Sequence, residues 1–322
     1  MMKQSNLLNR VIVAIIFIPI IYFIIIKGGF YFFLFVTIIS SLSLYEYYKL
    51  SEKKGVKPII WIGILFNILL QFSFLYERVK YLILNYLANY GIFPYYPTQF
   101  VILLGLIALF VFLVIILELF RNNGSPLLNI STTIFGFFYI SLFLGMLIAT
   151  RELFEWENFN SFFLTHSFNE LLKSGNNAYE INSKDWGGLF IFSTFVTIWI
   201  CDSAAYFVGK GFGKRKLFER VSPNKTWEGA LAGFIFSIIS MLLLKIFVII
   251  FLPLWHSIII GIIIGIFGQI GDLCQSLIKR DAGVKDSSSI IPGHGGVFDR
   301  FDSIIFISPL LYLYVDLVVL YI

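Results

Sequence analysis

Long apolar runs separated by short polar segments dominate the hydrophobic pattern of this chain. Several runs reach the ~20 residues that an α-helix needs to cross about 30 Å of hydrocarbon. The runs are continuous rather than alternating, which favours helices over a transmembrane β-barrel. The pattern therefore predicts an all-α polytopic integral membrane protein with about nine transmembrane helices. The predicted spans are residues 11–27, 30–48, 58–76, 100–120, 131–150, 188–208, 227–250, 257–275 and 303–321.

Composition supports the membrane assignment. The chain is 58% hydrophobic and 13% charged, and its mean hydropathy is +0.87; soluble domains are roughly 45–50% apolar. The first apolar run ends at Lys27 without a small-residue cleavage site, so we expect a retained span rather than a signal peptide. Cys201 and Cys274 are the only cysteines. They form neither a zinc pattern nor a disulfide framework, and we interpret them as small apolar helix residues.

Lysine and arginine are distributed unevenly between the two sets of loops. With a cytoplasmic N-terminus, the cytoplasmic segments hold 17 of these residues, the outer segments hold 6, and Lys245 lies in a span. The positive-inside rule then predicts that the N-terminus is cytoplasmic and the C-terminus is outside. The net charge of +5 reflects this asymmetry, and without an interleaved basic and aromatic surface we expect no nucleic-acid partner.

The expected organisation has three regions. Residues 1–150 hold the N-terminal transmembrane helices, 151–187 form an external loop, and 188–322 form the catalytic transmembrane region with cytoplasmic loops 209–226 and 276–302. The outer loops 77–99 and 151–186 are long, and the sequence assigns them no role.

The loop 276–302 concentrates ionisable residues beside apolar helices. Carboxylates, cations and glycines mixed next to a membrane suggest a site for metal-bound phosphates, since glycine lets backbone N–H groups approach an anion. Asp299 and Asp302 have i, i+3 spacing, so a helical start would point both carboxylates the same way. Hard oxygen ligands of this kind suit Mg²⁺. A structural and a catalytic role both stay open for His294.

Two acids lie within apolar helices. Asp202 and Asp272 fall near the cytoplasmic ends of the sixth and eighth predicted spans. A charge there costs about 2.5–3.5 kcal/mol on insertion scales, so each needs a partner or a watery cavity. If the eighth helix continues, Asp272, Ser276 and Lys279 share one face. The alternative is a carboxylate hydrogen-bonded to a neighbouring helix.

The segment 209–229 is basic and ends where the seventh span begins. Ser222 or Thr226 can cap that helix, and Glu228 complements its positive end. A helix N-terminus with Lys225 nearby is also suited to binding an anion. The alternative is an ordinary basic cytoplasmic loop. No predicted strand precedes the glycines, which argues against a P-loop or a Rossmann site.

Two blocks of the sequence resemble those of a known family. SLIKRDAGVKDSSSIIPGHGGVFDRFD resembles the signature of the phosphatidate cytidylyltransferases, the CDP-diacylglycerol synthases, with matches at Ser276, Lys279, Arg280, Lys285, Asp286, His294, Gly295, Gly296, Asp299, Arg300 and Asp302. SPNKTWEG is similar to the family's second block, which usually reads SPKKTWEG. Asn224 departs from that pattern and puts one phosphate contact in doubt. The close match covers about residues 195–302.

The resemblance implies a nine-helix nucleotidyltransferase of phospholipid biosynthesis. Such an enzyme converts CTP and phosphatidic acid into CDP-diacylglycerol and pyrophosphate, in the inner membrane with its active site on the cytoplasmic side. The resemblance also implies Mg²⁺ with K⁺ alongside, held by Asp272 and Asp299 with Asp302 near them. A homodimer stays open.

The remaining site residues fall into two groups. The predicted catalytic residues are Lys279, Arg280, Lys285, Asp286, His294 and Arg300. The predicted substrate-binding residues are Asp202, Ser222, Asn224, Lys225, Thr226, Glu228 and Ser276.

Two other functions are compatible with parts of this sequence pattern. A CTP-dependent lipid kinase of the dolichol type would transfer the γ-phosphate instead, and the complete HGGxxDRxD ending argues against it. An ion-coupled transporter also places acids inside helices, but it predicts acids near the bilayer midplane. The acids of this chain gather toward one membrane face.

Overall fold

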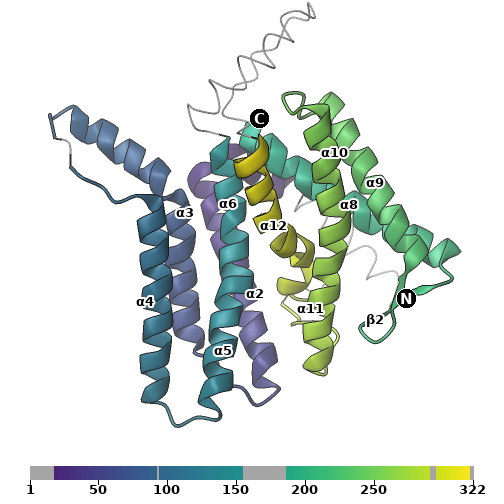
Figure 1. Cartoon of the computed structure of the whole chain (residues 1–322), viewed down its shortest axis with the longest axis horizontal. Coiled ribbons are helices and arrows are strands. Elements are labelled where there is room, and N and C mark those ends of the chain that lie inside the picture. The colour runs from purple at the N-terminus through teal and green to yellow at the C-terminus, as the bar shows by residue number, and fades with distance from the viewer. Residues whose placement is uncertain (1–17, 93, 155–185, 291–294, 320–322) are drawn as a thin grey trace, which may run out of the picture. The chain divides into compact units, whose positions relative to one another are not determined.

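The computed structural model describes residues 18–92, 94–154, 186–290 and 295–319 (Figure 1). The helices in the first half of the chain are α2 (Gly29–Glu52), α3 (Ile60–Ala88), α4 (Gln99–Leu119), α5 (Pro126–Gly136), the π-helical η1 (Phe137–Leu142) and α6 (Phe143–Leu153). The second half has α8 (Trp186–Phe212), strands β1 (Lys216–Phe218) and β2 (Ser222–Thr226), α9 (Trp227–Phe247), α10 (Leu254–Ile263), the π-helical η3 (Ile264–Gly268), α11 (Gln269–Asp281), the 3₁₀ turn η4 (Phe298–Arg300), α12 (Asp302–Tyr314) and the π-helical η5 (Val315–Val319).

Hydropathy predicted the membrane-spanning helices well. Eight helical segments of the described chain are long and apolar enough to cross a membrane, which confirms the all-α polytopic class. Of the first predicted span, 11–27, the described part is a shorter apolar helix, Ile18–Lys27, and the remainder lies outside the described residues. The end of the third span was wrong, because α3 continues to Ala88. No glycine or proline interrupts residues 76–88, so nothing local stops the helix there.

The chain forms two compact units. One unit contains Thr150–Lys285 and Phe301–Ile322 together with the chain up to Gly28, and the other contains Gly29–Ala149 and Asp286–Arg300. Segment Asp286–Arg300 therefore belongs with the N-terminal helices by its contacts, although the sequence analysis grouped it with residues 188–322. This assignment matters for function because the segment carries part of the predicted site.

Polar side chains connect the helices of the unit that contains Gly29–Ala149. The Tyr48 hydroxyl on α2 donates to the Thr133 carbonyl on α5 at 2.8 Å. The Gln71 amide on α3 donates to the Ser141 carbonyl of η1 at 2.8 Å. Hydrogen bonds between helices compensate polar groups that would otherwise be buried without a partner. The Tyr48 bond ties α2 to α5 close to Glu46, which lies two positions earlier on the same helix.

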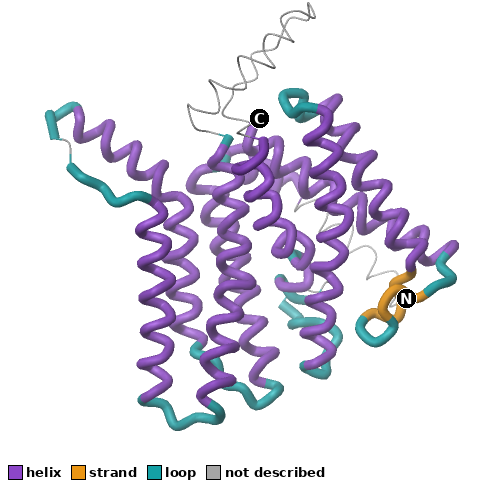
Figure 2. Tube along the Cα trace, viewed as in Figure 1, coloured by secondary structure: helices purple, strands orange, loops and turns teal. Residues whose placement is uncertain are grey.

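The other unit contains a β-hairpin and a close helix pair. Strands β1 and β2 are antiparallel and lie within the predicted loop 209–226 (Figure 2). The hairpin leads into α9, which packs along α8 through a Gly-x-x-x-Gly pair, Gly229 and Gly233. A Cβ added at Gly229 would lie 2.6 Å from the Ala205 carbonyl oxygen of α8. Small residues let the two backbones approach, and this approach sets the position of the hairpin's last strand.

Residues 254–281 form one uninterrupted helical segment through α10, η3 and α11. The eighth predicted span ended at residue 275, and the loop was predicted to begin at 276. Ser276 and Lys279 are instead helical, which is the continuation that would place them on one face with Asp272.

Because α9 contacts α8 closely at Gly229, a glycine-to-alanine substitution there should change thermal stability in the opposite direction from the same substitution at Gly105. Gly229→Ala should lower the thermal midpoint of the detergent-solubilised protein, because overpacking typically costs 1–3 kcal/mol. Gly105→Ala, within α4 and with no atom within 4 Å of the new Cβ, should raise the midpoint, because alanine favours a helix by roughly 1 kcal/mol over glycine. Equal shifts for the two variants would show that the α8–α9 approach is not tight.

Candidate active site

The predicted site residues fall into two polar groups, one in each compact unit. The first, which we call the α11 cluster, consists of Asp202, Lys225, Asp272, Ser276, Lys279 and Asp302. The second lies on the loop Asp286–Arg300 and centres on Asp299. Each is described by itself.

An ion pair forms the centre of the α11 cluster. The Lys225 ammonium Nζ lies 2.6 Å from Asp272 Oδ2, and both side chains are about one-third exposed. The Ser276 hydroxyl donates to Asp272 Oδ1 at 3.3 Å, one helical turn further along α11. Lys279 is almost fully buried on the same helix. Helical periodicity therefore brings a carboxylate, a hydroxyl and an ammonium to one face, as the sequence predicted.

Asp302 adds a second carboxylate to this cluster. It is the first residue of α12, where the positive end of the helix dipole favours a negative side chain. Its Oδ1 accepts from the Ser303 N–H at 2.7 Å. Asp272, Asp202 and Lys279 all lie within electrostatic range of its carboxyl group. Three aspartates and two lysines thus share one region of this unit, with the acids in excess.

Three predicted site residues, Thr226 and Glu228 from the substrate-binding group and Arg280 from the catalytic group, hold the hairpin in place. Thr226 caps α9, accepting from the Gly229 N–H at 3.2 Å. Glu228 accepts from the backbone N–H groups of Lys214 and Arg215 at 3.0 and 3.2 Å, which closes the base of the hairpin. Arg280 on α11 donates to the Val221 carbonyl at 3.3 Å. These residues have clear structural partners, whereas Ser222 is partly exposed and Asn224 is exposed.

The loop Asp286–Arg300 orients the Asp299 carboxylate. Asp299 Oδ2 accepts from the backbone N–H groups of Ser287 and Gly296 at 2.8 and 2.9 Å, and it lies 3.0 Å from the Ser287 hydroxyl. Donors of this kind fix the direction of a carboxylate ligand. Lys285, Asp286 and Arg300 are exposed. His294 lies outside the described residues.

The expectation of one helical start through Asp299 and Asp302 was wrong. Residues Phe298–Arg300 form a 3₁₀ turn, and α12 begins only at Asp302. Phe301 between them has φ −116° and ψ 13°, which is not helical. The i, i+3 argument therefore does not apply to this pair, because it requires a continuous helical backbone.

Sequence reasoning missed Glu46 on α2. Its side chain is buried, and it accepts hydrogen bonds from the same loop that holds Asp299. A signal was present, since an acid within an apolar helix points to function by default. Glu46 lies in the second predicted span, 30–48, and carries the same signal as Asp202 and Asp272.

The carboxylates of the two polar groups suit a hard divalent cation, but phosphate oxygens of a substrate would have to supply further ligands. Among the described residues, no three His, Cys, Asp or Glu side chains come close enough together to hold a metal ion. Mg²⁺ typically takes one or two carboxylates and completes its shell with water and phosphate oxygens. Within the α11 cluster, Asp272 and Asp302 are oxygen ligands of that type, and in the other unit the oriented Asp299 is a ligand of the same type.

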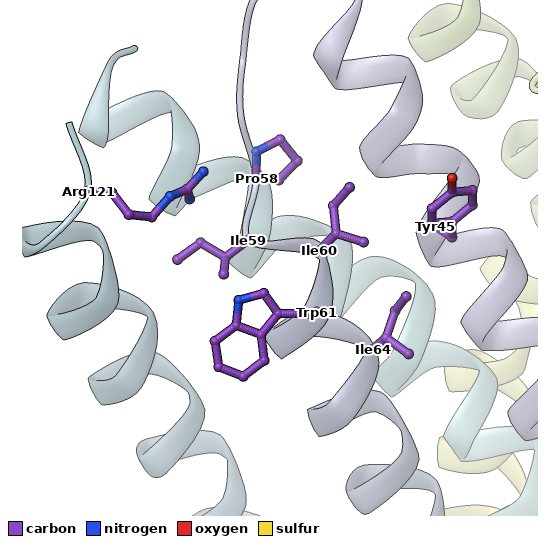
Figure 3. A pocket seen from close by; sticks show the side chains of 7 residues that line it. All are labelled: Tyr45, Pro58, Ile59, Ile60, Trp61, Ile64 and Arg121. Carbon is purple, nitrogen blue, oxygen red and sulfur yellow. The ribbon is translucent and has the colours of Figure 1, made fainter. Parts of the chain in front are cut away.

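A separate apolar groove of about 470 Å³ lies near the ends of α2, α3 and α4 (Figure 3). Its one cation, Arg121, is paired with the buried Glu118 at 2.9 Å. The groove has a different character from the two polar groups, and we assign it no chemistry. Its lining residues are Tyr45, Pro58, Ile59, Ile60, Trp61, Ile64 and Arg121.

The fold and these groups define a polytopic helical membrane protein with carboxylates and cations clustered within and beside its apolar helices. A sequence model of the Cytidylyltransferase family matches residues 8–318, so the chain belongs to this family.

Several curated relatives are similar in sequence. A phosphatidate cytidylyltransferase of Bacillus subtilis is 46% identical over 134 residues, which is 41% of this chain and 50% of the relative. The enzymes of that name from Staphylococcus saprophyticus and Staphylococcus aureus are 49% and 45% identical over 133 residues, again 41% of this chain and 50% of each relative. The chain spans about half the length of the curated relatives it matches.

The excess of acids in the α11 cluster predicts a cost to stability when no cation is present. Asp302→Asn removes a buried ionisable carboxyl group from beside two other aspartates, so the variant should melt at a higher temperature than the parent protein in the presence of a chelator. A change of 1 kcal/mol corresponds to roughly 1–2 °C for a chain of 322 residues. Asp316→Asn, at the other end of the helical segment 302–319, is the control and should not raise the midpoint. A lower midpoint for Asp302→Asn would mean that this carboxylate is a net stabilising group.

Proposed function

We propose that this chain transfers CMP from CTP to phosphatidic acid, giving CDP-diacylglycerol and pyrophosphate. The main support is the α11 cluster. Its carboxylates and lysines lie together within and beside apolar helices, in a member of the Cytidylyltransferase family. Relatives named phosphatidate cytidylyltransferase support the choice of substrates.

The reaction brings together two anions. An oxygen of the lipid phosphate attacks the α-phosphorus of CTP, a new P–O–P linkage forms, and the bond to the β-phosphate breaks to release pyrophosphate. A phosphomonoester has a second pKa of about 6, so the attacking group is already largely ionised near pH 7. General-base help is therefore minor, and the main barrier is repulsion, about 4 kcal/mol per charge pair at 4 Å and an effective dielectric near 20.

The cations of the α11 cluster are suited to reducing this repulsion. Lys225 is partly exposed and sits directly before the N-terminus of α9, where helix N–H groups also favour an anion. We assign Lys225 and Lys279 to phosphate binding, with Ser276 orienting Asp272. Phosphoryl-type transfer depends mostly on positioning and on such electrostatic stabilisation.

The carboxylates are proposed as ligands for Mg²⁺, with K⁺ alongside. Asp272, Asp299 and Asp302 would hold the metal, which when bound polarises phosphate oxygens and neutralises developing charge. The remaining residues keep their proposed roles: Asp202, Ser222, Asn224, Thr226 and Glu228 on the substrate side, and Arg280, Lys285, Asp286, His294 and Arg300 beside the reacting phosphates.

The location follows from the charge distribution. The lysine and arginine excess supports a cytoplasmic N-terminus, and it puts segments 209–226 and 276–302 on the cytoplasmic side of an inner membrane, where CTP is found. Phosphatidic acid would reach the site from that leaflet of the bilayer.

A labelled-substrate assay tests the reaction. The purified protein in vesicles containing phosphatidic acid should move an α-phosphate label from CTP into lipid and release a γ-phosphate label as pyrophosphate. A chelator should stop both, because the proposed metal would polarise phosphate oxygens and offset the negative charge that develops during transfer. A γ-label that enters lipid would identify a kinase instead, and absence of labelled lipid would refute the proposed function.

The variant Asp299→Asn tests the metal assignment in the same assay, because asparagine is close in size to aspartate but carries no charge. It should insert normally and make no detectable labelled lipid, since Asp299 is assigned to the metal. Turnover at the parent rate would remove Asp299 from the proposed site.

Orientation can be measured separately. A reporter fused after Ile322 should face away from the cytoplasm, because the distribution of lysine and arginine places the C-terminus outside. The measurement is protease or thiol-reagent access from each side of sealed membrane vesicles, with a fusion at the N-terminus as the opposite control. Access to both ends from the same side would contradict the proposed orientation.

A further inference from the structure

The carboxylate of Glu46 is fully occupied by one loop. Oε1 accepts from the Ser288 hydroxyl at 2.6 Å and from the Val297 N–H at 3.0 Å. Oε2 accepts from the Ser287 hydroxyl at 2.7 Å and from the Phe298 N–H at 2.9 Å. All four donors belong to the loop Asp286–Arg300, and we call this arrangement the Glu46 clamp. The side chain is only 1% exposed.

A buried acid in an apolar helix needs such compensation. A charge inside a transmembrane segment is costly, and four donors, two of them backbone N–H groups, offset that cost. If Glu46 served only to join helices, donors from neighbouring helices would be expected. Its four donors instead come from both ends of the loop, from Ser287 and Ser288 on one side and from Val297 and Phe298 on the other. The clamp therefore closes the loop at its base.

The clamp is continuous with the Asp299 carboxylate. The Ser287 hydroxyl lies 2.7 Å from Glu46 Oε2 and 3.0 Å from Asp299 Oδ2. A hydroxyl has one proton, so it can donate to only one of these carboxylates at a time. The Ser287 backbone N–H donates to Asp299 throughout, at 2.8 Å. Ser287 therefore contacts both carboxylates. When Glu46 fixes the position of Ser287, it also fixes the Ser287 N–H that orients the Asp299 carboxylate.

Gly296 shows how little room the clamp leaves. A Cβ added there would overlap the Ser287 hydroxyl and the Glu46 carboxylate. The same glycine donates its N–H to Asp299 Oδ2 at 2.9 Å. The absence of a side chain at 296 lets one stretch of backbone serve both carboxylates.

We infer that Glu46 is a positioning residue for the proposed reaction, holding both ends of the loop Asp286–Arg300 so that Asp299 is aimed before substrate and metal bind. The inference rests on the proposed function for its catalytic consequence. Its structural content, a loop held by one carboxylate of a distant helix, stands on the hydrogen bonds alone.

Glu46→Gln tests the clamp with little change in volume. An amide presents one acceptor oxygen, so one of the two backbone N–H groups loses its partner. Amide hydrogen exchange of the full-length protein in detergent should become faster in peptides covering Ser287–Phe298. The Mg²⁺ concentration for half-maximal product formation should rise about 10- to 100-fold, the usual effect of losing a group that orients a metal ligand.

Glu118→Gln is the matched control. Glu118 is also a buried acid in an apolar helix, 3% exposed, but it accepts from Asn129 and Arg121. Its replacement should leave both the exchange of Ser287–Phe298 and the Mg²⁺ dependence unchanged. Equal effects from the two variants would reduce Glu46 to a general stabilising residue and overturn the inference.

Ser288→Ala provides a milder test in case Glu46→Gln does not fold. It removes one donor of the clamp and leaves both backbone donors, so it should give a smaller shift in the same direction. The double variant should be no worse than Glu46→Gln alone, because the two groups act through one contact. Parent-like exchange and Mg²⁺ dependence in Ser288→Ala and Glu46→Gln would refute the clamp. If the parent protein makes no liponucleotide, the proposed function fails, while the exchange measurement still decides whether Glu46 holds the loop.

Discussion

The compensation of charge inside apolar helices is the constraint on which this structure depends. Glu46 meets it with four donors from one loop, and Glu118 meets it with Asn129 and Arg121. Asp272 meets it with Lys225 at 2.6 Å. An uncompensated charge in hydrocarbon costs several kcal/mol, so each acid defines what must pack beside it. Segments far from these helices in sequence are thereby brought to defined places.

The α11 cluster meets the same constraint only in part. Lys225 balances Asp272, but Asp302 has Asp202 and Asp272 within electrostatic range as well as Lys279. A group of acids that repel one another is suited to binding cations, and lysines beside them are suited to phosphate. The Cytidylyltransferase family assignment agrees with that chemistry.

Local patterns predicted a large part of the fold and of the site. Continuous apolar runs predicted the membrane helices, because helix length is set by bilayer thickness. The 3.6-residue repeat placed Asp272, Ser276 and Lys279 on one face. The β-hairpin at 216–226 was missed because its strands are only 3 and 5 residues long, too short to show an alternating pattern. The helix break at Phe301 was missed because spacing alone does not reveal backbone angles.

What the sequence determined by itself was therefore most of what neighbours along the chain set: the membrane spans, the helix face of α11, the cap of α9 and the composition of the polar loops. Tertiary structure alone decided that Asp286–Arg300 packs with the N-terminal helices. It also decided that Glu46 accepts a hydrogen bond from Ser287, which lies 241 positions away in the sequence. The physical reason is that a buried carboxylate needs donors but does not specify which segment will provide them. That choice is made only when all helices pack together.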